Sequence, residues 1–285
     1  MTSWVKFTVS IPDTQQDTLV AQLSTAGFGG FVQEDDYIDC YVEKKKWTSG
    51  VQTRSREVLQ RFAKEYPKLE LRTETTDVED RNWNAEWERS AGIVDATKKI
   101  VIKPSWKSLR RRDKGKIVLH IDPKMSFGTG HHETTRVCLR LMEYYVRRGD
   151  HVADFGTGTG VLAIAAAKLG ASRVIAVDTD SWSFENASEN VLRNKAGDRI
   201  TVHKGSIVAL GKRPFDLVVA NIDLPTITKF LGRLLTLTRK GGVLILSGLL
   251  MTDLVPVLRL INRRSITPLL LADEGEWIGF ALQRT

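Results

Sequence analysis

Cysteine is scarce in this 285-residue sequence, and long apolar runs are absent from it. The two cysteines, Cys40 and Cys138, are far apart and lie among apolar neighbours, so we expect buried reduced thiols and neither a disulfide nor a metal site. No stretch reaches the roughly 20 apolar residues that a membrane-spanning helix needs. The first seven residues lack the basic and then apolar layout of a signal peptide. These absences predict a soluble protein of the cytoplasm.

Basic residues are under-represented in the first third of the chain, although the net charge is +8. Residues 1–90 hold 12 Lys and Arg against 16 Asp and Glu, which suits a basic partner. Residues 98–116, in contrast, hold nine basic residues and one acid, and such a stretch could contact the phosphates of RNA. The alternative is a solvated loop, because runs of charge are common on protein surfaces.

The length of the chain exceeds the common single-domain size of roughly 100 to 150 residues, so we expect two domains. Strands and helices are predicted in the order strand, helix, strand, strand, helix, strand at 4–11, 13–26, 28–33, 37–42, 55–66 and 69–75. This order predicts a small ferredoxin-like α+β domain over residues 1–76. A charged segment with Trp83 and Trp87 as aromatic anchors follows, and it predicts a linker over residues 77–92.

From residue 151 onward, predicted strands alternate with predicted helices. The strands are expected at 151–155, 173–177, 200–203, 215–220, 242–247, 266–272 and 277–283, and the helices at 161–169, 181–193, 226–236 and 253–261. Such alternation predicts a mostly parallel sheet that is covered by helices on both faces. The expected fold class is therefore α/β, with a Rossmann-like, seven-stranded domain over residues 93–285.

A glycine-rich turn, Asp154-Phe155-Gly156-Thr157-Gly158-Thr159-Gly160, follows the first strand of this second domain. Gly156 and Gly158 carry no side chain, so the backbone can approach a ligand closely, and the next helix offers free N–H groups. The spacing is G-x-G-x-G, whereas dinucleotide sites have G-x-G-x-x-G. Asp154 would repel a pyrophosphate but attract an ammonium group. The turn therefore predicts a site for S-adenosylmethionine, whose methionine moiety carries such a group.

Asp178 ends the next predicted strand, where its two oxygens could accept hydrogen bonds from both ribose hydroxyls of an adenosine. The glycine turn and this acid occur at the separation that one strand–helix–strand unit dictates, which favours the cofactor role. The alternative is that Asp178 or Asp180 caps the helix that begins near Ser181.

Asn221 follows a strand that ends at the same sheet edge, so its amide could hydrogen-bond a cofactor or a nucleophile. The alternative is an Asn turn that only closes the strand. Upstream, residues 122–135 crowd small and hydroxyl side chains before a predicted helix. His131, His132 and Glu133 within this loop could suggest a metal, but adjacent side chains cannot easily share one ion, so we expect none.

Together these residues resemble the ribosomal protein L11 methyltransferase family (PrmA), whose members methylate lysine and N-terminal amines of that ribosomal protein. The likeness runs from Arg81 to the last residue and rests on Asn82-Trp83-Asn84-Ala85-Glu86-Trp87, Ile102-Lys103-Pro104-Ser105-Trp106, Phe127-Gly128-Thr129-Gly130, His132, Thr134-Thr135, Asp154 to Gly160, Asp178, Val219-Ala220-Asn221-Ile222 and Leu246-Ser247-Gly248. The resemblance implies a class I methyltransferase with cofactor contacts at Thr135, Gly156, Asp178 and Asn221. It also implies a first domain that grips the substrate protein.

The chemistry of methyl transfer suggests what the polar residues at the sheet edge do. Transfer from a sulfonium is an in-line displacement, so the protein chiefly aligns a neutral amine behind the methyl carbon. We hypothesise that the amide oxygen of Asn221 and the carbonyl oxygen of Ile222 accept the N–H bonds of this amine. The expected enzyme is therefore an S-adenosylmethionine-dependent protein N-methyltransferase that acts on a lysine side chain or an N-terminal amine, and its expected substrate is a ribosomal protein.

Two other functions remain open from the sequence. A nucleic-acid base N-methyltransferase is favoured by the basic stretch 98–116 and by residues 221–224, which distantly resemble base-methylating Asn-Pro-Pro-aromatic motifs but lack the stacking aromatic. A cofactor-binding assembly factor without activity is the second alternative, and the intact Asp154, Asp178 and Asn221 argue against it.

Overall fold

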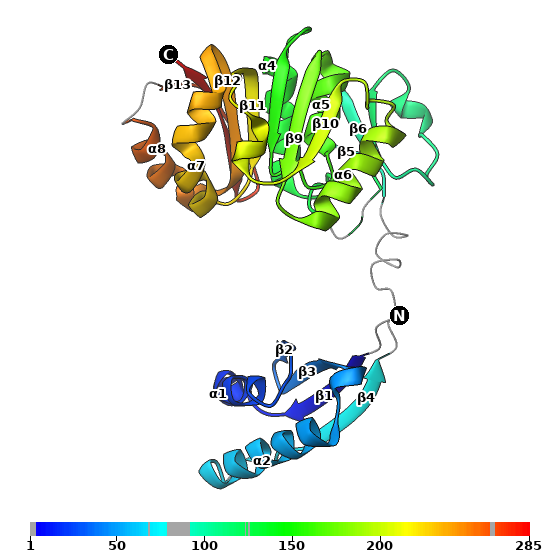
Figure 1. Cartoon of the computed structure of the whole chain (residues 1–285), viewed down its shortest axis with the longest axis vertical. Helices are drawn as coiled ribbons and strands as arrows, with labels where there is room; N and C mark the ends of the chain where they lie inside the picture. The colour runs from blue at the N-terminus through cyan, green and yellow to red at the C-terminus, as the bar shows by residue number, and fades with distance from the viewer. Residues whose placement is uncertain (1–3, 68, 79–91, 123, 125, 263–265) are drawn as a thin grey trace. The chain divides into compact units, whose positions relative to one another are not determined.

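A computed structural model of the chain describes residues 4–67, 69–78, 92–122, 124, 126–262 and 266–285. The chain divides into two compact units, Met1–Ala85 (unit 1) and Glu86–Thr285 (unit 2), which Figure 1 colours from blue to cyan and from cyan-green to red. Most of the predicted linker, 77–92, and the whole motif from Asn82 to Trp87 lie outside the described residues. Among the described residues, no helix has the length and apolar character to span a membrane.

Unit 1 follows the predicted order of strands and helices. Its elements are β1 (Trp4–Ser10), α1 (Asp13–Ser24), β2 (Gly30–Glu34), β3 (Tyr37–Glu43), the short η1 (Lys44–Lys46), α2 (Ser49–Glu65) and β4 (Thr73–Val78). The strands pair antiparallel in the order β2-β3-β1-β4, which confirms the ferredoxin-like arrangement. Alternate residues of β1, Val5, Phe7 and Val9, are buried in one core on one face of the sheet.

Two elements of unit 1 have bounds that differ from the predicted ones by more than two residues. Helix α2 begins at Ser49, six residues earlier than predicted, because its buried stripe already starts at Val51 and continues through Val58 and Phe62. Strand β4 begins later than predicted and continues to Val78, which pairs with Trp4 of β1. The polar composition of β4 gives no clear bounds in the sequence, and pairing with β1 supplies its backbone hydrogen bonds.

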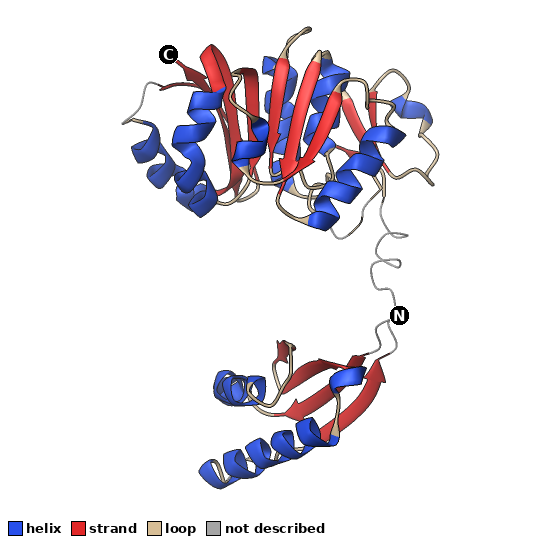
Figure 2. Cartoon of the chain, in the orientation of Figure 1, coloured by secondary structure: helices blue, strands red, loops and turns tan. Residues whose placement is uncertain are grey.

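Unit 2 is built around a sheet of seven strands (Figure 2). Its elements are β5 (Val94–Asp95), β6 (Ile100–Lys103), η2 (Arg111–Asp113), β7 (Ile117–His120), α4 (Glu133–Tyr145), β8 (His151–Phe155), α5 (Val161–Leu169), β9 (Arg173–Asp178), α6 (Ser181–Arg193), β10 (Ile200–Lys204), η3 (Ile207–Leu210), β11 (Phe215–Asn221), α7 (Leu224–Leu237), β12 (Thr238–Leu250), η4 (Met251–Asp253), α8 (Leu254–Ile261), β13 (Ile266–Glu274) and β14 (Trp277–Arg284). The order in the large sheet is β10-β9-β8-β11-β12-β14-β13. Neighbouring strands from β10 to β12 are parallel, and β14 runs antiparallel to β12 and β13.

Both faces of this sheet are buried, as the strand and helix alternation predicts. Val152 and Ala153, successive residues of β8, belong to two different apolar clusters on opposite faces. Helices α4 and α5 pack in the first cluster, and helices α7 and α8 pack in the second. The structure therefore confirms a mostly parallel seven-stranded sheet with helices on both faces.

The strand order reverses between β8 and β11. From β8 the chain proceeds outward to β9 and β10, and it then returns to place β11 on the other side of β8. Ligands of open α/β sheets bind beyond the carboxyl ends of the strands at such a reversal. The strands β8, β9 and β11 end at Phe155, Asp178 and Asn221, so the sheet brings the three predicted motifs to one edge.

A second, three-stranded sheet of order β5-β6-β7 was not predicted from the sequence. It contains part of the basic stretch 98–116, so this stretch is not a loop throughout. Asp95 pairs with Arg110 at 2.6 Å and with Lys116 at 3.1 Å, and Lys116 also pairs with the buried Asp113 at 2.9 Å. Part of the positive charge of the stretch is therefore neutralised within unit 2. The strands escape prediction because they are only two to four residues long.

Candidate active site

A cavity of about 460 Å³ lies at the carboxyl edge of the large sheet. Five of the predicted site residues line it: Gly156, Gly158, Asp178, Asn221 and Ile222. Two others, Thr135 and Asp154, do not line it. The sheet thus brings together residues that are up to 66 positions apart in the sequence, counted from Gly156 to Ile222.

The turn between β8 and α5 requires glycine at two positions, because of the backbone conformation there and because neighbouring atoms lie close. Gly156 has φ 78° and Gly158 has φ 54°, both in the left-handed region that favours glycine. A Cβ atom on Gly156 would lie 2.7 Å from Cγ2 of Ile222, and one on Gly158 would overlap the carbonyl oxygen of Phe127. Gly156 and Gly158 are therefore required by contacts with Ile222, directly after β11, and with the loop that carries Phe127.

Asp154 is fully buried behind this turn. Its Oδ2 accepts hydrogen bonds from the hydroxyl of Thr157 at 2.6 Å and from the backbone N–H of Ala163 at 3.1 Å. Burial raises the pKa of this carboxyl from 3.8 to about 7, against the opposing effect of these two donors. Asp154 therefore holds the turn against the first residues of α5. Its contact with an ammonium group remains a prediction, because the carboxylate does not line the cavity.

Asp178 faces the cavity from the end of β9. Its Oδ2 accepts a hydrogen bond from the backbone N–H of Gly158 at 2.9 Å, and its Oδ1 accepts one from the N–H of Asp180 at 3.1 Å. Asp180, in contrast, caps α6, since its carboxylate accepts from the N–H of Ser183 at 2.8 Å. The helix-capping alternative therefore applies to Asp180, and the carboxylate of Asp178 keeps lone pairs that could bind a ligand.

Asn221 ends β11 with its amide at the cavity. Its Nδ2 donates a hydrogen bond to the hydroxyl of Thr134 at 3.2 Å, and its buried Oδ1 has no hydrogen-bond partner within the part of the chain that the structure describes. Leaving a buried oxygen without a donor costs about 1 to 3 kcal/mol. The side chain contacts a residue 87 positions away, which argues against an Asn turn that only closes the strand. The unpartnered oxygen is the arrangement expected of a group that receives a ligand.

Thr135 lies in the first turn of α4, where it is fully buried. Its hydroxyl, too, has no hydrogen-bond partner among the described residues. Its predicted cofactor contact remains a prediction, because the residue does not line the cavity. Across residues 4–67, 69–78, 92–122, 124, 126–262 and 266–285, no group of three His, Cys, Asp or Glu side chains could hold a metal ion.

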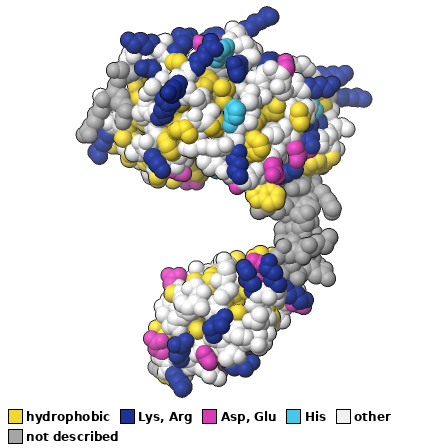
Figure 3. Space-filling view, viewed as in Figure 1, with side chains coloured by type: hydrophobic (Ala, Val, Ile, Leu, Met, Phe, Trp, Pro, Cys, Tyr) yellow, Lys and Arg dark blue, Asp and Glu magenta, His cyan; other side chains and the backbone are white. Residues whose placement is uncertain are grey.

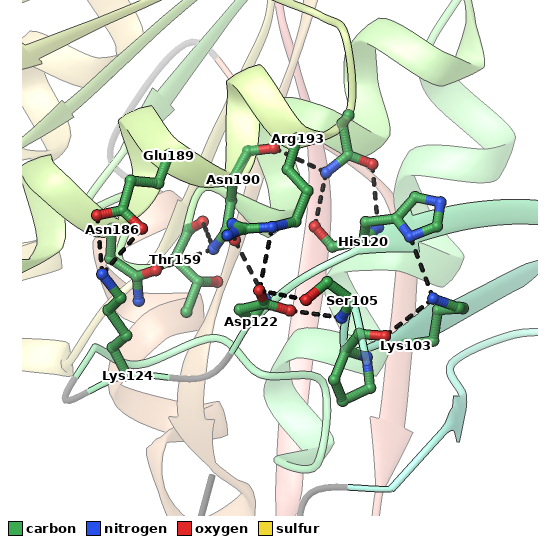
Figure 4. Close-up of polar contacts among 12 residues, drawn as sticks. Lys103, Ser105, His120, Asp122, Lys124, Thr159, Asn186, Glu189, Asn190 and Arg193 are labelled. Carbon is green, nitrogen blue, oxygen red and sulfur yellow. Dashed lines mark hydrogen bonds and ion pairs between the residues drawn. The ribbon is translucent and has the colours of Figure 1, made fainter. Parts of the chain in front are cut away.

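Helix α6 contacts Asp122 and Lys124, in the segment that leads to Phe127, as Figure 4 shows for these two residues. The fully buried Asn190 accepts a hydrogen bond from the N–H of Asp122 at 3.1 Å and donates one to the carbonyl oxygen of Thr159 at 3.0 Å. Thr159 in turn donates from its N–H to the oxygen of Phe127 at 2.8 Å and from its hydroxyl to that of Gly128 at 2.7 Å. Asn190 and Thr159 therefore fix the glycine turn and the Phe127 loop relative to each other.

Two ion pairs support the same loop (Figure 4). The carboxylate of Asp122 pairs with Arg193 at 3.0 Å and accepts a hydrogen bond from the hydroxyl of Ser105 at 2.7 Å. Lys124 pairs with Glu189 at 2.8 Å. This support was not predicted from the sequence. The sequence feature that indicates it is the recurrence of Asn186, Asn190 and Asn194 on the buried face of a helix, where polar side chains need hydrogen-bond partners.

The strand order, the antiparallel β14 and the glycine turn at the strand reversal define a class I methyltransferase fold. The family described as Ribosomal protein L11 methyltransferase (PrmA) matches residues 3–285. The chain belongs to this family. The predicted resemblance, the predicted class of enzyme and its cofactor S-adenosylmethionine are thereby confirmed.

Individual relatives agree with this assignment. The Ribosomal protein L11 methyltransferase of Desulforamulus reducens is 30% identical over 302 residues, which cover 98% of each chain. That of Pelotomaculum thermopropionicum is 39% identical over 207 residues, which cover 73% of this chain and 67% of the relative. The crystal structure of ribosomal protein L11 methylase from Lactobacillus delbrueckii subsp. bulgaricus is 32% identical with a TM-score of 0.64, and the match covers 68% of this chain and 99% of that one.

The cavity fits S-adenosylmethionine on three observations. Its volume lies within the roughly 300 to 1,000 Å³ of small-molecule sites. Gly156 and Gly158 leave the backbone open to close approach. Polar groups converge on it, namely the carboxylate of Asp178 and the unpartnered oxygen of Asn221.

The raised pKa of Asp154 generates a prediction for stability against pH. The folded protein binds this proton more tightly than the unfolded chain, so the free energy of unfolding should fall as pH rises from about 4 to about 7. The full effect is roughly 4 kcal/mol at 1.36 kcal/mol per unit. Asp154→Asn cannot titrate and should lose this slope in urea unfolding, whereas the control Asp180→Asn should keep it. Equal slopes in wild type and Asp154→Asn would contradict the buried titration.

Proposed function

We propose that this enzyme transfers methyl groups from S-adenosylmethionine to amine nitrogens of ribosomal protein L11. Its family and its relatives of that name support the substrate. The observation that carries the proposal is the buried, unpartnered oxygen of Asn221 at the edge of the cavity that Asp178 also lines. A ribosomal protein as substrate is consistent with an enzyme of the cytoplasm.

The cofactor would be held by the ends of β8 and β9. The carboxylate of Asp178 would accept hydrogen bonds from the ribose hydroxyls, and the backbone at Gly156 and Gly158 would lie against the ligand. S-adenosylmethionine supplies, when bound, a methyl carbon that is electrophilic because it is attached to a sulfonium. Asp154 acts from behind the turn by holding it in place, which its bonds to Thr157 and Ala163 support.

The amine would be held by the end of β11. The oxygens of Asn221 and Ile222 can only accept hydrogen bonds, so they suit a nucleophile that carries N–H groups and would repel a carboxylate or a phenolate. Two such bonds aim the nitrogen lone pair at the methyl carbon. A free lysine amine, with a pKa near ~10.4, must first lose a proton at a cost of roughly 4 to 5 kcal/mol at neutral pH, and desolvation in a closed site lowers that pKa.

Unit 1 is proposed to recognise the substrate protein. The acidic excess of residues 1–90 is opposite in sign to the charge of a basic ribosomal protein. Lys and Arg side chains are spread over the face of unit 2 that Figure 3 shows. The large sheet and its two apolar clusters are complete without residues of unit 1.

Contact with RNA through residues 98–116 is a second, additional proposal. Trp106 is 47% exposed, and the neighbouring Lys107, Arg111 and Lys114 are exposed as well. An exposed aromatic side chain among basic ones suits stacking on a base beside phosphates. Arg110, Arg112 and Lys116 pair with Asp95 or Asp113, whereas no ion pair of Lys107, Arg111 or Lys114 is seen among the described residues.

Labelling with tritiated S-adenosylmethionine tests the proposed function. Purified ribosomal protein L11 should take up label with time, and in a cell lysate the main labelled product should be degraded by protease and resist nuclease. Amino-acid analysis should place the methyl groups on amine nitrogen. A main product that nuclease degrades would instead identify a nucleic-acid methyltransferase.

Removal of the Asp178 carboxylate should weaken cofactor binding. Asp178→Ala loses two charge-assisted hydrogen bonds to the ribose, so we expect the Kd for S-adenosylmethionine to rise about 10- to 100-fold in titration calorimetry. Asp180→Ala is the matched control, because it removes a helix cap and should lower stability with little effect on the Kd. Unchanged affinity in Asp178→Ala would remove ribose recognition from the role of this residue.

Removal of the Asn221 amide should slow turnover more than it weakens cofactor binding. The amine is absent from the enzyme–cofactor complex, so Asn221→Ala should lower kcat about 10- to 100-fold and change the cofactor Kd much less. The activity of the wild type should rise with pH as the substrate amine loses its proton. A folded Asn221→Ala enzyme with wild-type turnover would eliminate the role of this side chain in positioning the amine.

Deletion of unit 1 should separate cofactor binding from substrate recognition. A chain of residues 92–285 keeps both apolar clusters of unit 2, so its cofactor Kd should stay within about twofold of that of the full chain. Its kcat/KM for ribosomal protein L11 should fall about 100-fold or more, since the recognition surface is lost. If the shortened enzyme methylated the whole protein at full efficiency, unit 1 would not be the recognition domain.

A further inference from the structure

A chain of hydrogen bonds connects Asn221 to the N-terminus of α4. The Nδ2 of Asn221 lies 3.2 Å from the hydroxyl oxygen of Thr134, and this oxygen lies 2.8 Å from Nδ1 of His132. The backbone N–H of Thr134 also donates to the same Nδ1 at 3.3 Å, which makes His132 the N-cap of the helix. Histidine is not among the usual N-cap residues, so capping alone does not explain its presence here.

The direction of each hydrogen bond follows from chemistry. A backbone N–H can only donate, so Nδ1 of His132 is an acceptor and the imidazole is neutral with its proton on Nε2. The hydroxyl of Thr134 has one hydrogen, and it must point at Nδ1 because that nitrogen has none. Toward Asn221 the hydroxyl can therefore only accept. The group of Asn221 that faces it must be the NH₂ group, and the carbonyl oxygen must face away from Thr134.

The imidazole ring is held so that Nδ1 stays in this position. Its neighbours are the ring of Phe127, with centroids 5.1 Å apart, and the ring of Trp277, with centroids 4.6 Å apart, both in edge-to-face contact. A half-turn of the ring would place a C–H group where Nδ1 now lies, and Thr134 would lose its acceptor. Thr134 itself is fully buried, so water does not compete for its hydroxyl.

We propose that His132 and Thr134 are positioning residues that fix the amide of Asn221 with its oxygen directed at the substrate amine. This inference rests on the proposed function, in which that oxygen accepts an N–H bond of the amine. Without the hydroxyl of Thr134, both orientations of the amide become accessible. In the wrong one, an NH₂ group faces the N–H groups of the amine, and two donors meet with no acceptor.

The test uses a substitution that removes the hydroxyl and little else. Thr134→Val keeps the side-chain volume and the backbone N–H that donates to His132. We expect kcat for methylation of ribosomal protein L11 to fall about tenfold, which corresponds to the loss of one oriented hydrogen bond. The Kd for S-adenosylmethionine should stay within about twofold. Thr134→Ser restores the hydroxyl and should return kcat to within about twofold of the wild type.

A double variant separates this inference from the proposed function. In the Asn221→Ala background, Thr134→Val should cause no further loss of kcat, because no amide remains to be oriented. Wild-type turnover in Asn221→Ala alone would overturn the proposed function. If Asn221→Ala is slow but Thr134→Val has wild-type turnover, the proposed role of Asn221 stands. The proposed role of Thr134 is then wrong. An equal loss of kcat in both backgrounds, or no rescue by Thr134→Ser, would assign Thr134 a purely structural effect and overturn the proposal.

A second variant keeps the proposal testable should Thr134→Val fail to fold. His132→Asn retains a good helix cap but removes the imidazole that fixes the hydroxyl. We expect a similar, about tenfold, loss of kcat with an unchanged cofactor Kd. Unchanged turnover in this variant would overturn the proposal as well.

Discussion

The register of the parallel strands β8, β9 and β11 is the constraint on which the site depends. Phe155 pairs with Val177 on one side and with Ala220 on the other. The next residue of each strand therefore falls in one row across the sheet edge, which contains Asp178, Gly156 and Asn221. A slip of one residue would turn each side chain to the opposite face and separate the acid from the amide. The two buried faces of the sheet, each packed with apolar side chains and helices, hold the register in place.

Hydrogen bonds between distant segments then complete the cavity that the register begins. Asn190 and Thr159 attach the Phe127 loop to the glycine turn, and Thr134 attaches the end of β11 to α4. These side chains are buried, where a lost partner costs more than it would at the surface. The same environment leaves the oxygen of Asn221 without a donor and raises the pKa of Asp154. The oxygen of Asn221 and the carboxylate of Asp154 are thus both less stable than they would be in water, as is common at functional sites.

Much of the fold and the row of site residues could be predicted from the sequence, because short stretches of sequence indicate both. Apolar strands, the glycine turn and polar residues at strand ends are all visible in short windows, and parallel strands must end at one edge. The small sheet β5-β6-β7 could not be predicted, since its strands have two to four residues. Nor could the hydrogen bonds that the carboxylate of Asp154 accepts from Thr157 and Ala163 be predicted. The links through Asn190 and Thr134 join residues 31 and 87 positions apart, so no local pattern could identify the partners of these side chains.

The central claim is that the amide oxygen of Asn221 receives the amine to be methylated. The distance from this oxygen to the substrate nitrogen tests it most directly, in a crystal structure of the enzyme with S-adenosylhomocysteine and ribosomal protein L11. We expect a nitrogen–oxygen distance of about 3 Å, with the NH₂ group of Asn221 still facing Thr134. A substrate nitrogen beyond hydrogen-bond reach, with the oxygen of Asn221 bound to the cofactor instead, would contradict it.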